Sequence, residues 1–261
     1  MTQAAPTGAT EAPGFFGGVR CFWSGLVFLL KTPGAWPLAL VPTVVVVALG
    51  SFFGFLAIQL VPPWVADLWG RHMAVDGPMG SVLGAGLQVI ATLLALVLSF
   101  LAAFSLAQPL SGPALEALVR RQELDLGAPT RPETPFTTDV LRSLQSSAVG
   151  FLIGTPMLLL LLVVGLVFPP AQVVTIPLKA LVVTTVLAWD LTDYPLSVRG
   201  VSIRTRIAFL QRHFFAVLGM AGGVALLALV PCGVLLALPI GVAGATRLIH
   251  EIERAEGVRT V

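Results

Sequence analysis

The sequence is poor in charged residues. Aspartate, glutamate, lysine and arginine make up 11% of the 261 residues, whereas a soluble domain carries about 25%. Hydrophobic residues make up 56%, and the mean hydropathy is +0.94. This balance excludes an ordinary soluble domain and predicts an integral membrane protein.

The sequence also lacks the motifs of common catalytic and metal sites. Its two cysteines, Cys21 and Cys232, are far apart, so neither a disulfide framework nor a cysteine metal site is indicated. No Walker phosphate loop, His-Glu-x-x-His zinc motif or Gly-x-Ser-x-Gly elbow is present. We therefore predict a protein that is not an enzyme, has no catalytic residues and uses no cofactor or metal. Any transport would be passive or coupled to another gradient.

Long apolar runs dominate the sequence. Each is near or above the ~20 residues that span a bilayer as a helix. The first span is expected over residues 38–61, ending at Pro62-Pro63, and the second over 80–107. The predicted fold class is all-α, a polytopic helical membrane protein with two long spanning helices.

Two further apolar stretches are broken by prolines. Residues 148–189 contain Pro156, Pro169-Pro170 and Pro177, and residues 214–249 contain Pro231 and Pro239. Each stretch predicts a helical hairpin. The legs of the second are about 17 residues or roughly 25 Å long, shorter than the ~30 Å hydrocarbon core. Full crossing and partial entry into the membrane both stay open.

The remaining segments are assigned by composition. Residues 1–13 lack the pattern of a secretory signal and are expected to form a disordered lead. Residues 14–254 form a single membrane domain. It is expected to contain an interfacial helix over 14–32, a cytoplasmic loop over 108–146 with an amphipathic helix at 113–126, and a tail over 255–261.

Positive charge is distributed unevenly between the predicted loops. Thirteen of the fifteen lysines and arginines lie in the N-terminal segment, 108–146, 190–213 or the C-terminal segment. The positive-inside rule places both termini in the cytoplasm. Because these residues sit at segment ends and form no continuous stripe, no nucleic-acid surface is indicated.

Polar residues cluster between the two predicted hairpins. Asp193 and Tyr194 are followed by Arg199, Arg204 and Arg206. An acid beside several arginines can form a hydrogen-bonded gate at the mouth of a substrate pathway. The alternative is a positively charged loop with surface salt bridges.

Two other cations stand apart from this cluster. Arg20 could attract an anion to the interface, or it could anchor lipid headgroups. Lys179 lies within an apolar leg, where a charge is costly unless it faces a cavity or reaches the interface.

Glycines recur with small-xxx-small spacing. This spacing allows helices to approach closely and is compatible with an oligomer. The pairs are Gly50/Gly54, Gly80/Gly84, Gly150/Gly154 and Gly219/Gly223.

Several short motifs resemble one membrane protein family. They are Gly14-Phe15-Phe16, Pro33-Gly34, Leu40-Val41-Pro42, Pro109-Leu110-Ser111-Gly112 with Glu116, Asp193-Tyr194-Pro195 with its arginines, Pro231, Pro239 and Gly244-Ala245-Thr246. Together they resemble the CysZ-type sulfate permeases and the related etoposide-induced protein 2.4 membrane proteins. The resemblance implies two hairpins that partly enter the bilayer and a homo-oligomer in the bacterial inner membrane. It also implies sulfate or sulfite uptake without ATP hydrolysis.

The chain departs from this family pattern at one point. The resemblance leads us to expect basic residues directly after Pro33-Gly34, where they would help to hold the anion, but Ala35 and Trp36 follow. The alternative function is therefore a non-transporting scaffold or interaction protein that docks partners on residues 108–146.

Overall fold

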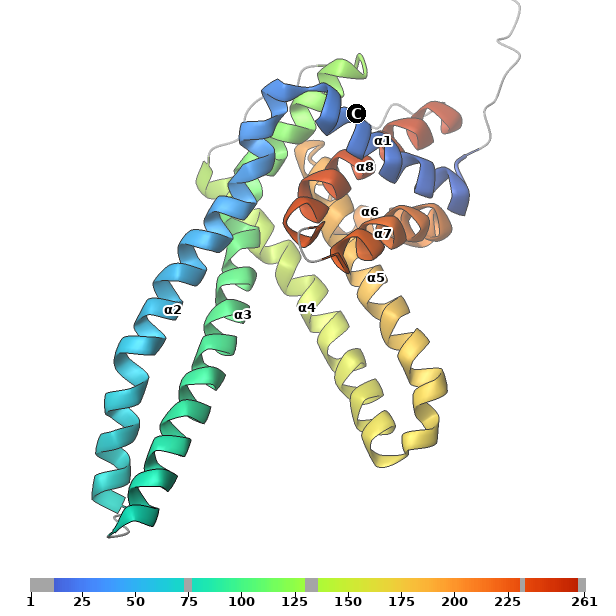
Figure 1. The fold of residues 1–261 in the computed structure, drawn as a ribbon. Helices are drawn as coiled ribbons and strands as arrows, with labels where there is room; N and C mark the ends of the chain where they lie inside the picture. The colour runs from blue at the N-terminus through green and yellow to red at the C-terminus, as the bar shows by residue number, and fades with distance from the viewer. Residues whose placement is uncertain (1–11, 73–76, 130–135, 231–232, 258–261) are drawn as a thin grey trace, which may run out of the picture. The chain divides into compact units, whose positions relative to one another are not determined.

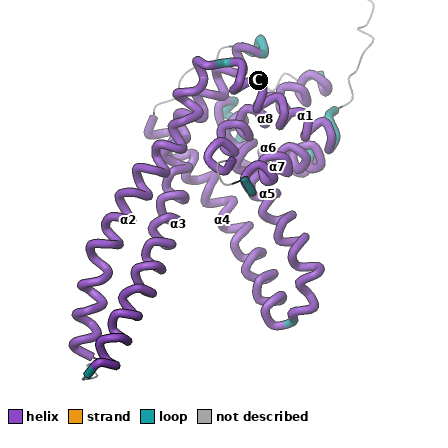
Figure 2. The backbone as a smooth tube through the Cα atoms, in the orientation of Figure 1, coloured by secondary structure: helices purple, strands orange, loops and turns teal. Residues whose placement is uncertain are grey.

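The computed structural model describes residues 12–72, 77–129, 136–230 and 233–257. Over these residues the regular structure is helical (Figures 1 and 2). The all-α fold class is therefore confirmed. Most of the expected disordered lead and the end of the expected tail lie outside the described residues. The elements are α1 (Phe15–Lys31), η1 (Pro33–Ala35), α2 (Trp36–His72), α3 (Pro78–Asp125), α4 (Phe136–Val167), η2 (Pro169–Ala171), α5 (Gln172–Val198), α6 (Ile203–Arg212), α7 (Phe214–Ala228) and α8 (Gly233–Glu256).

Five described helices are long and apolar enough to cross a membrane. They lie within Pro33–Arg71, Met79–Asp125, Ala148–Val167, Pro169–Val198 and Gly233–Glu256. The count rises to six if α6 and α7, which meet at 90°, are taken as one broken span. The protein is therefore a multi-pass membrane protein by length and composition. The depth of the hairpins stays a prediction.

The chain divides into two compact units, and the smaller comprises Pro42–Ser111. In it the central parts of α2 and α3 run side by side (Figure 1). Ser99 Oγ donates to the Phe53 carbonyl oxygen at 3.2 Å, and Gly54 lies against Leu96. Most of the large side chains point outward and are apolar, which suits a surface covered by lipid.

The expected end of the first long helix at Pro62-Pro63 is wrong. α2 continues through Pro62 and Pro63 as far as His72. Proline removes one N–H donor and disfavours a helix interior. Leaving the helix within a membrane would expose many more backbone groups to hydrocarbon, so continuation is the less costly course.

The expected loop over 108–146 is also largely helical. Its first part extends α3 to Asp125, and residues 136–146 form the start of α4. Leu115, Leu118 and Val119 are fully buried, so this part of α3 belongs to the core. The location of the segment outside the bilayer stays a prediction.

The larger unit comprises Met1–Val41 and Gly112–Val261. One part of it is the α4–α5 hairpin, which turns at η2 (Figure 1). Gly154 meets Val186 there, and Gly150 approaches Trp189 and Asp190. The close approach that the glycine spacing predicted is thus present between α4 and α5.

The other part of this unit packs α1 against α7 and α8. A Cβ atom at Gly18 would lie 1.8 Å from the Ala216 carbonyl oxygen, and one at Gly25 would lie 2.5 Å from that of Ile240. These distances are too short for any side chain. The helices therefore touch backbone to backbone around a core that includes Cys21, Met220 and Ile252.

Candidate functional site

Asp193 and Arg206 form a buried ion pair. Arg206 Nη1 donates to Asp193 Oδ1, and both side chains are more than nine-tenths buried. Arg206 Nε also donates to the Val201 carbonyl oxygen at 2.8 Å. This pair joins the end of α5 to α6. Each charge is compensated, as burial in a low-dielectric interior requires.

Arg199 forms a second buried ionic group. Its Nε and Nη2 atoms each lie 2.9 Å from Glu123 Oε1 on α3. Its Nη1 atom lies 3.2 Å from Glu253 Oε1 on α8. One guanidinium at the end of α5 thus joins two other helices, by a charge-assisted hydrogen bond to Glu123 and by an ion pair with Glu253.

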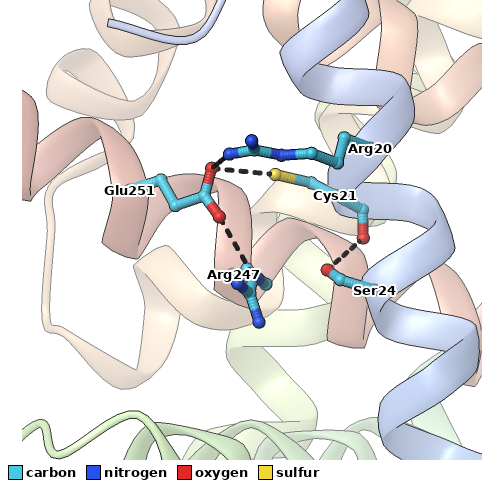
Figure 3. Close-up of polar contacts among 5 residues, drawn as sticks. All are labelled: Arg20, Cys21, Ser24, Arg247 and Glu251. Carbon is cyan, nitrogen blue, oxygen red and sulfur yellow. Dashed lines mark hydrogen bonds and ion pairs between the residues drawn. The ribbon is translucent and has the colours of Figure 1, made fainter. Parts of the chain in front are cut away.

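The third ionic group surrounds Glu251 (Figure 3). Its carboxylate accepts hydrogen bonds from Arg20 and Arg247, both at 3.0 Å, and from the Cys21 thiol at 3.6 Å. Ser24 Oγ donates to the Cys21 carbonyl oxygen at 2.7 Å. The hydrogen bond from Arg20 to Glu251 raises the pKa of Arg20 above its ordinary value, so the guanidinium stays charged.

The last turns of α8 bring these contacts together. Glu251 binds Arg20 of α1, Glu253 binds Arg199 of α5, and Glu256 lies 3.3 Å from Arg212 of α6. Acidic residues near a helix C-terminus are unfavourable beside its negative dipole end. Cations from three other helices offset this cost and hold those helices to α8.

A cavity of about 620 Å³ lies between the start of α1 and the end of α8. It is lined by Ala12, Pro13, Gly14, Phe16, Gly17, Arg20, Glu251 and Arg254. Arg254 is exposed and has no ion-pair partner among the described residues. The cavity wall therefore carries two guanidinium groups and one carboxylate, a net positive charge open to solvent.

Arg121 lies at the break between α1 and α2. A Cβ atom added to Gly34 would lie 2.9 Å from Arg121 Nη2 and 3.3 Å from Cζ. The Arg121 guanidinium, carried by α3, therefore packs directly against the η1 turn. Arg121 is exposed and forms no ion pair with any described residue.

The structure separates the predicted gate residues. Asp193 and Arg206 come together, while Arg199 and Arg20 bind carboxylates elsewhere. Tyr194 is buried, and Arg204 is exposed. Sequence reasoning missed Glu123, Glu251 and Glu253 as partners and Arg121 as a neighbour of Gly34. The acidic residues near the end of α8 were a signal for Glu251 and Glu253, but the sequence did not show which cations they bind.

Among the described residues, no three or more histidine, cysteine, aspartate or glutamate side chains gather as a metal site would require. The helices, their apolar surfaces and the ionic groups define a polytopic helical membrane protein. A sequence model of the family described as sulfate transporter CysZ/etoposide-induced protein 2.4 matches residues 21–239. The chain therefore belongs to this family, which is a family of membrane transporters. No curated protein matches the chain.

Proposed function

We propose that the protein is a permease for a small inorganic anion, sulfate or sulfite, that acts without ATP hydrolysis. We place it in a bacterial inner membrane as a homo-oligomer, with both termini in the cytoplasm. The family description supports the substrate class, and thirteen of fifteen cationic residues on one predicted side support the orientation.

The observation that carries the proposal is the position of Arg121 on Gly34. Neither residue after Pro33-Gly34 can hold an anion, because Ala35 is buried and the Trp36 indole donates to the Leu29 carbonyl oxygen at 2.8 Å. Arg121 brings a guanidinium to the same turn from α3. A guanidinium offers several donors in the fork geometry that suits an oxyanion.

The cavity between α1 and α8 adds a second support. It is wide enough for a hydrated oxyanion and carries Arg20 and Arg254. Glu251 offsets part of this charge and fixes Arg20 in place. Such a positively charged recess raises the local concentration of anions. It would serve as an entrance and is separate from the buried ion pairs.

The test is radiolabelled sulfate influx into liposomes that contain the purified protein, compared with empty liposomes and with a competing anion. The variant is Arg121→Gln, which keeps length and polarity but removes charge. Arg71→Gln is the matched control, because Arg71 is an exposed arginine paired with Asp67 within α2.

Saturable influx that falls at least about tenfold in Arg121→Gln and less than about twofold in Arg71→Gln would support the proposal, since one charge-assisted bond contributes on that order. Influx equal in both variants would remove Arg121 from the path. No influx from correctly folded protein would overturn sulfate as the substrate.

The second candidate function is a non-transporting scaffold. Ala35 and Trp36, which replace the expected basic residues, favour it. Its expected docking surface is reduced, because Leu115, Glu116 and Leu118 are buried. A scaffold would therefore use the exposed face of α3 near Leu124 or another surface, and it would show no influx.

A further inference from the structure

The α4–α5 hairpin contains a buried threonine that lacks the hydrogen bond which most described helical threonines make. Five helical threonines donate to the carbonyl oxygen four residues earlier, at 2.7–2.8 Å: Thr92, Thr184, Thr185, Thr192 and Thr246. This back-bond is the usual way to satisfy a hydroxyl within an apolar helix. Thr175 is 4% exposed, and its Oγ1 atom has no hydrogen-bond partner among the described residues.

The Thr175 hydroxyl points across the hairpin to a glycine. A Cβ atom at Gly165 on α4 would lie 3.1 Å from Thr175 Oγ1 and 3.5 Å from Lys179 Nζ. The Gln172 side-chain amide closes the turn by donating to the Gly165 carbonyl oxygen at 3.3 Å. A hydroxyl and an ammonium thus meet at a position where α4 has no side chain.

Lys179 has no charge to balance it in this hairpin. It is the one charged residue in the sequence between 148 and 189. It forms no ion pair with a described residue. The nearest carboxylate along α5 is Asp190, eleven residues or about 16 Å farther along the helix.

The surroundings of the hairpin end are apolar. Leu166, Val167 and Val173 are each more than three-quarters exposed, and Phe168 is 60% exposed. A protein with these residues in a bilayer presents them to hydrocarbon. An unpaired ammonium beside them is costly unless a counter-charge is present.

The polar groups that converge here favour a negative ligand. Lysine offers only donors, and the threonine hydroxyl can donate as well. No described carboxylate lies among them to attract a cation. Because Gly165 has no side chain, no atom of α4 separates the two donors from a ligand on this face.

We propose that Lys179 and Thr175, facing Gly165, form an oxyanion subsite within the α4–α5 hairpin. The shared chemistry is a sulfate- or phosphate-type group, supplied by the free anion or by a lipid headgroup. As a subsite for the free anion it rests on the proposed function. It adds a further anion-binding position to the permease, distinct from Arg121 and from the cavity at α1.

The test measures equilibrium binding of radiolabelled sulfate to the purified full chain in detergent, and separately the phospholipid phosphorus retained on purification. The variants are Lys179→Gln, Thr175→Val and Gly165→Ala, the last of which places a methyl group against both donors and keeps them. Lys31→Gln is the matched control, because Lys31 is the only other lysine in the sequence and is exposed at the end of α1.

A fall of at least about tenfold in sulfate affinity in the three hairpin variants, with less than about twofold in Lys31→Gln, supports the subsite with free anion. Loss of retained phospholipid in the same variants supports it with a lipid headgroup. If Lys179→Gln misfolds, the sulfate affinity and retained phospholipid of Gly165→Ala still test the subsite. Unchanged sulfate binding together with unchanged lipid retention overturns the proposal.

Liposome influx separates this inference from the proposed function. Saturable sulfate influx that is unaffected by Lys179→Gln and Gly165→Ala would retain the permease and reject the subsite. Lys179-dependent binding in a protein without influx would retain the subsite and reject the permease.

Discussion

Arg199 of α5 and Glu123 of α3 lie 2.9 Å apart, and their side chains are at most 3% exposed. The residues are 76 positions apart in the sequence. Burial has removed water from both charges, so each needs a counter-charge within the protein. This pair therefore fixes the last turns of α3 to the end of α5.

Removing either partner alone should destabilise the fold. We expect Arg199→Gln to lower the free energy of unfolding by about 3–5 kcal/mol, because the buried Glu123 carboxylate loses this cation. Glu123→Gln should cost less, because Arg199 keeps its ion pair with Glu253. The double substitution Arg199→Met/Glu123→Met should cost less than the sum of the single changes. Thermal or denaturant unfolding of the detergent-purified protein measures these differences.

Arg71→Gln provides the control for this comparison. Arg71 binds Asp67 at 2.8 Å, but both side chains are more than half exposed. Its loss should cost less than about 1 kcal/mol. Equal costs for Arg199→Gln and Arg71→Gln would contradict the role of burial.

Asp193 is expected to act chiefly as a structural partner of Arg206. Asp193→Asn leaves the buried Arg206 guanidinium without its counter-charge, so stability should fall by roughly 3 kcal/mol. Arg204→Ala should change stability by less than about 0.5 kcal/mol, because its side chain is exposed. Unfolding midpoints and sulfate influx are measured for both.

The two readouts distinguish a structural pair from a gate. If sulfate influx through Asp193→Asn falls only in proportion to the amount of folded protein, Asp193 has a structural role. Influx lost from Asp193→Asn at full stability would show a gate, as the sequence hypothesis has it. Arg204→Ala would then be expected to reduce influx as well.

Gly219 should not tolerate a side chain, whereas Gly222 should. A Cβ atom at Gly219 would lie 2.2 Å from the Phe15 carbonyl oxygen. Apart from the adjacent residues and the backbone of α7 itself, no described atom lies within 4 Å of a Cβ atom at Gly222. Gly219→Ala should separate α1 from α7 and reduce the folded yield sharply. Gly222→Ala should be neutral or stabilise by about 0.5–1 kcal/mol, as alanine favours a helix. Fluorescence-detected size exclusion compares the two variants, and equal profiles would argue against the close packing.

Cys21 should resist thiol reagents. It is fully buried, and burial, with the nearby negative charge of Glu251, raises the pKa of its thiol to about 12. In the unfolded chain the thiol ionises near its ordinary value of about 8.5. The folded state thus keeps its proton longer, and its stability should fall between about pH 8.5 and 12.

A Cys232→Ala background isolates this thiol. Iodoacetamide labelling at pH 8 should be slow in the folded protein and rapid after denaturation, as followed by mass spectrometry. Glu251→Gln should lower the pKa and raise the labelling rate at high pH. Rapid labelling of the native protein at pH 8 would contradict the buried position of Cys21.

The sequence predicted the class of fold because hydropathy and helix length are local properties. The spacing of the apolar residues Phe15, Val19, Phe22, Leu26 and Leu30 predicted a helix over 14–32, and α1 covers Phe15–Lys31. Its position at the membrane interface stays a prediction. The end of α2 could not be predicted in the same way. Proline signals at 62–63 reflect behaviour in water, whereas a surrounding membrane favours continued helix.

The candidate site was less predictable because its partners are distant in sequence. Arg206 and Asp193 lie 13 residues apart, and their pairing was within reach of local reasoning. Arg20 and Glu251 lie 231 residues apart, and no local pattern joins them. The position of Arg121 on Gly34 likewise depends on how α3 returns to η1, which only the folded chain shows.

The backbone contacts of α1 at Gly18 and Gly25 limit how this part of the protein can move. With carbonyl oxygens of α7 and α8 so close, α1 can neither rotate nor slide along them without a clash. The links from Glu251 and Glu256 of α8 to α1 and α6 add to this restraint. If the protein alternates between two conformations, α1, α7 and α8 would move as one rigid body. The change in backbone conformation would then occur in the segments that join this rigid body to its neighbours.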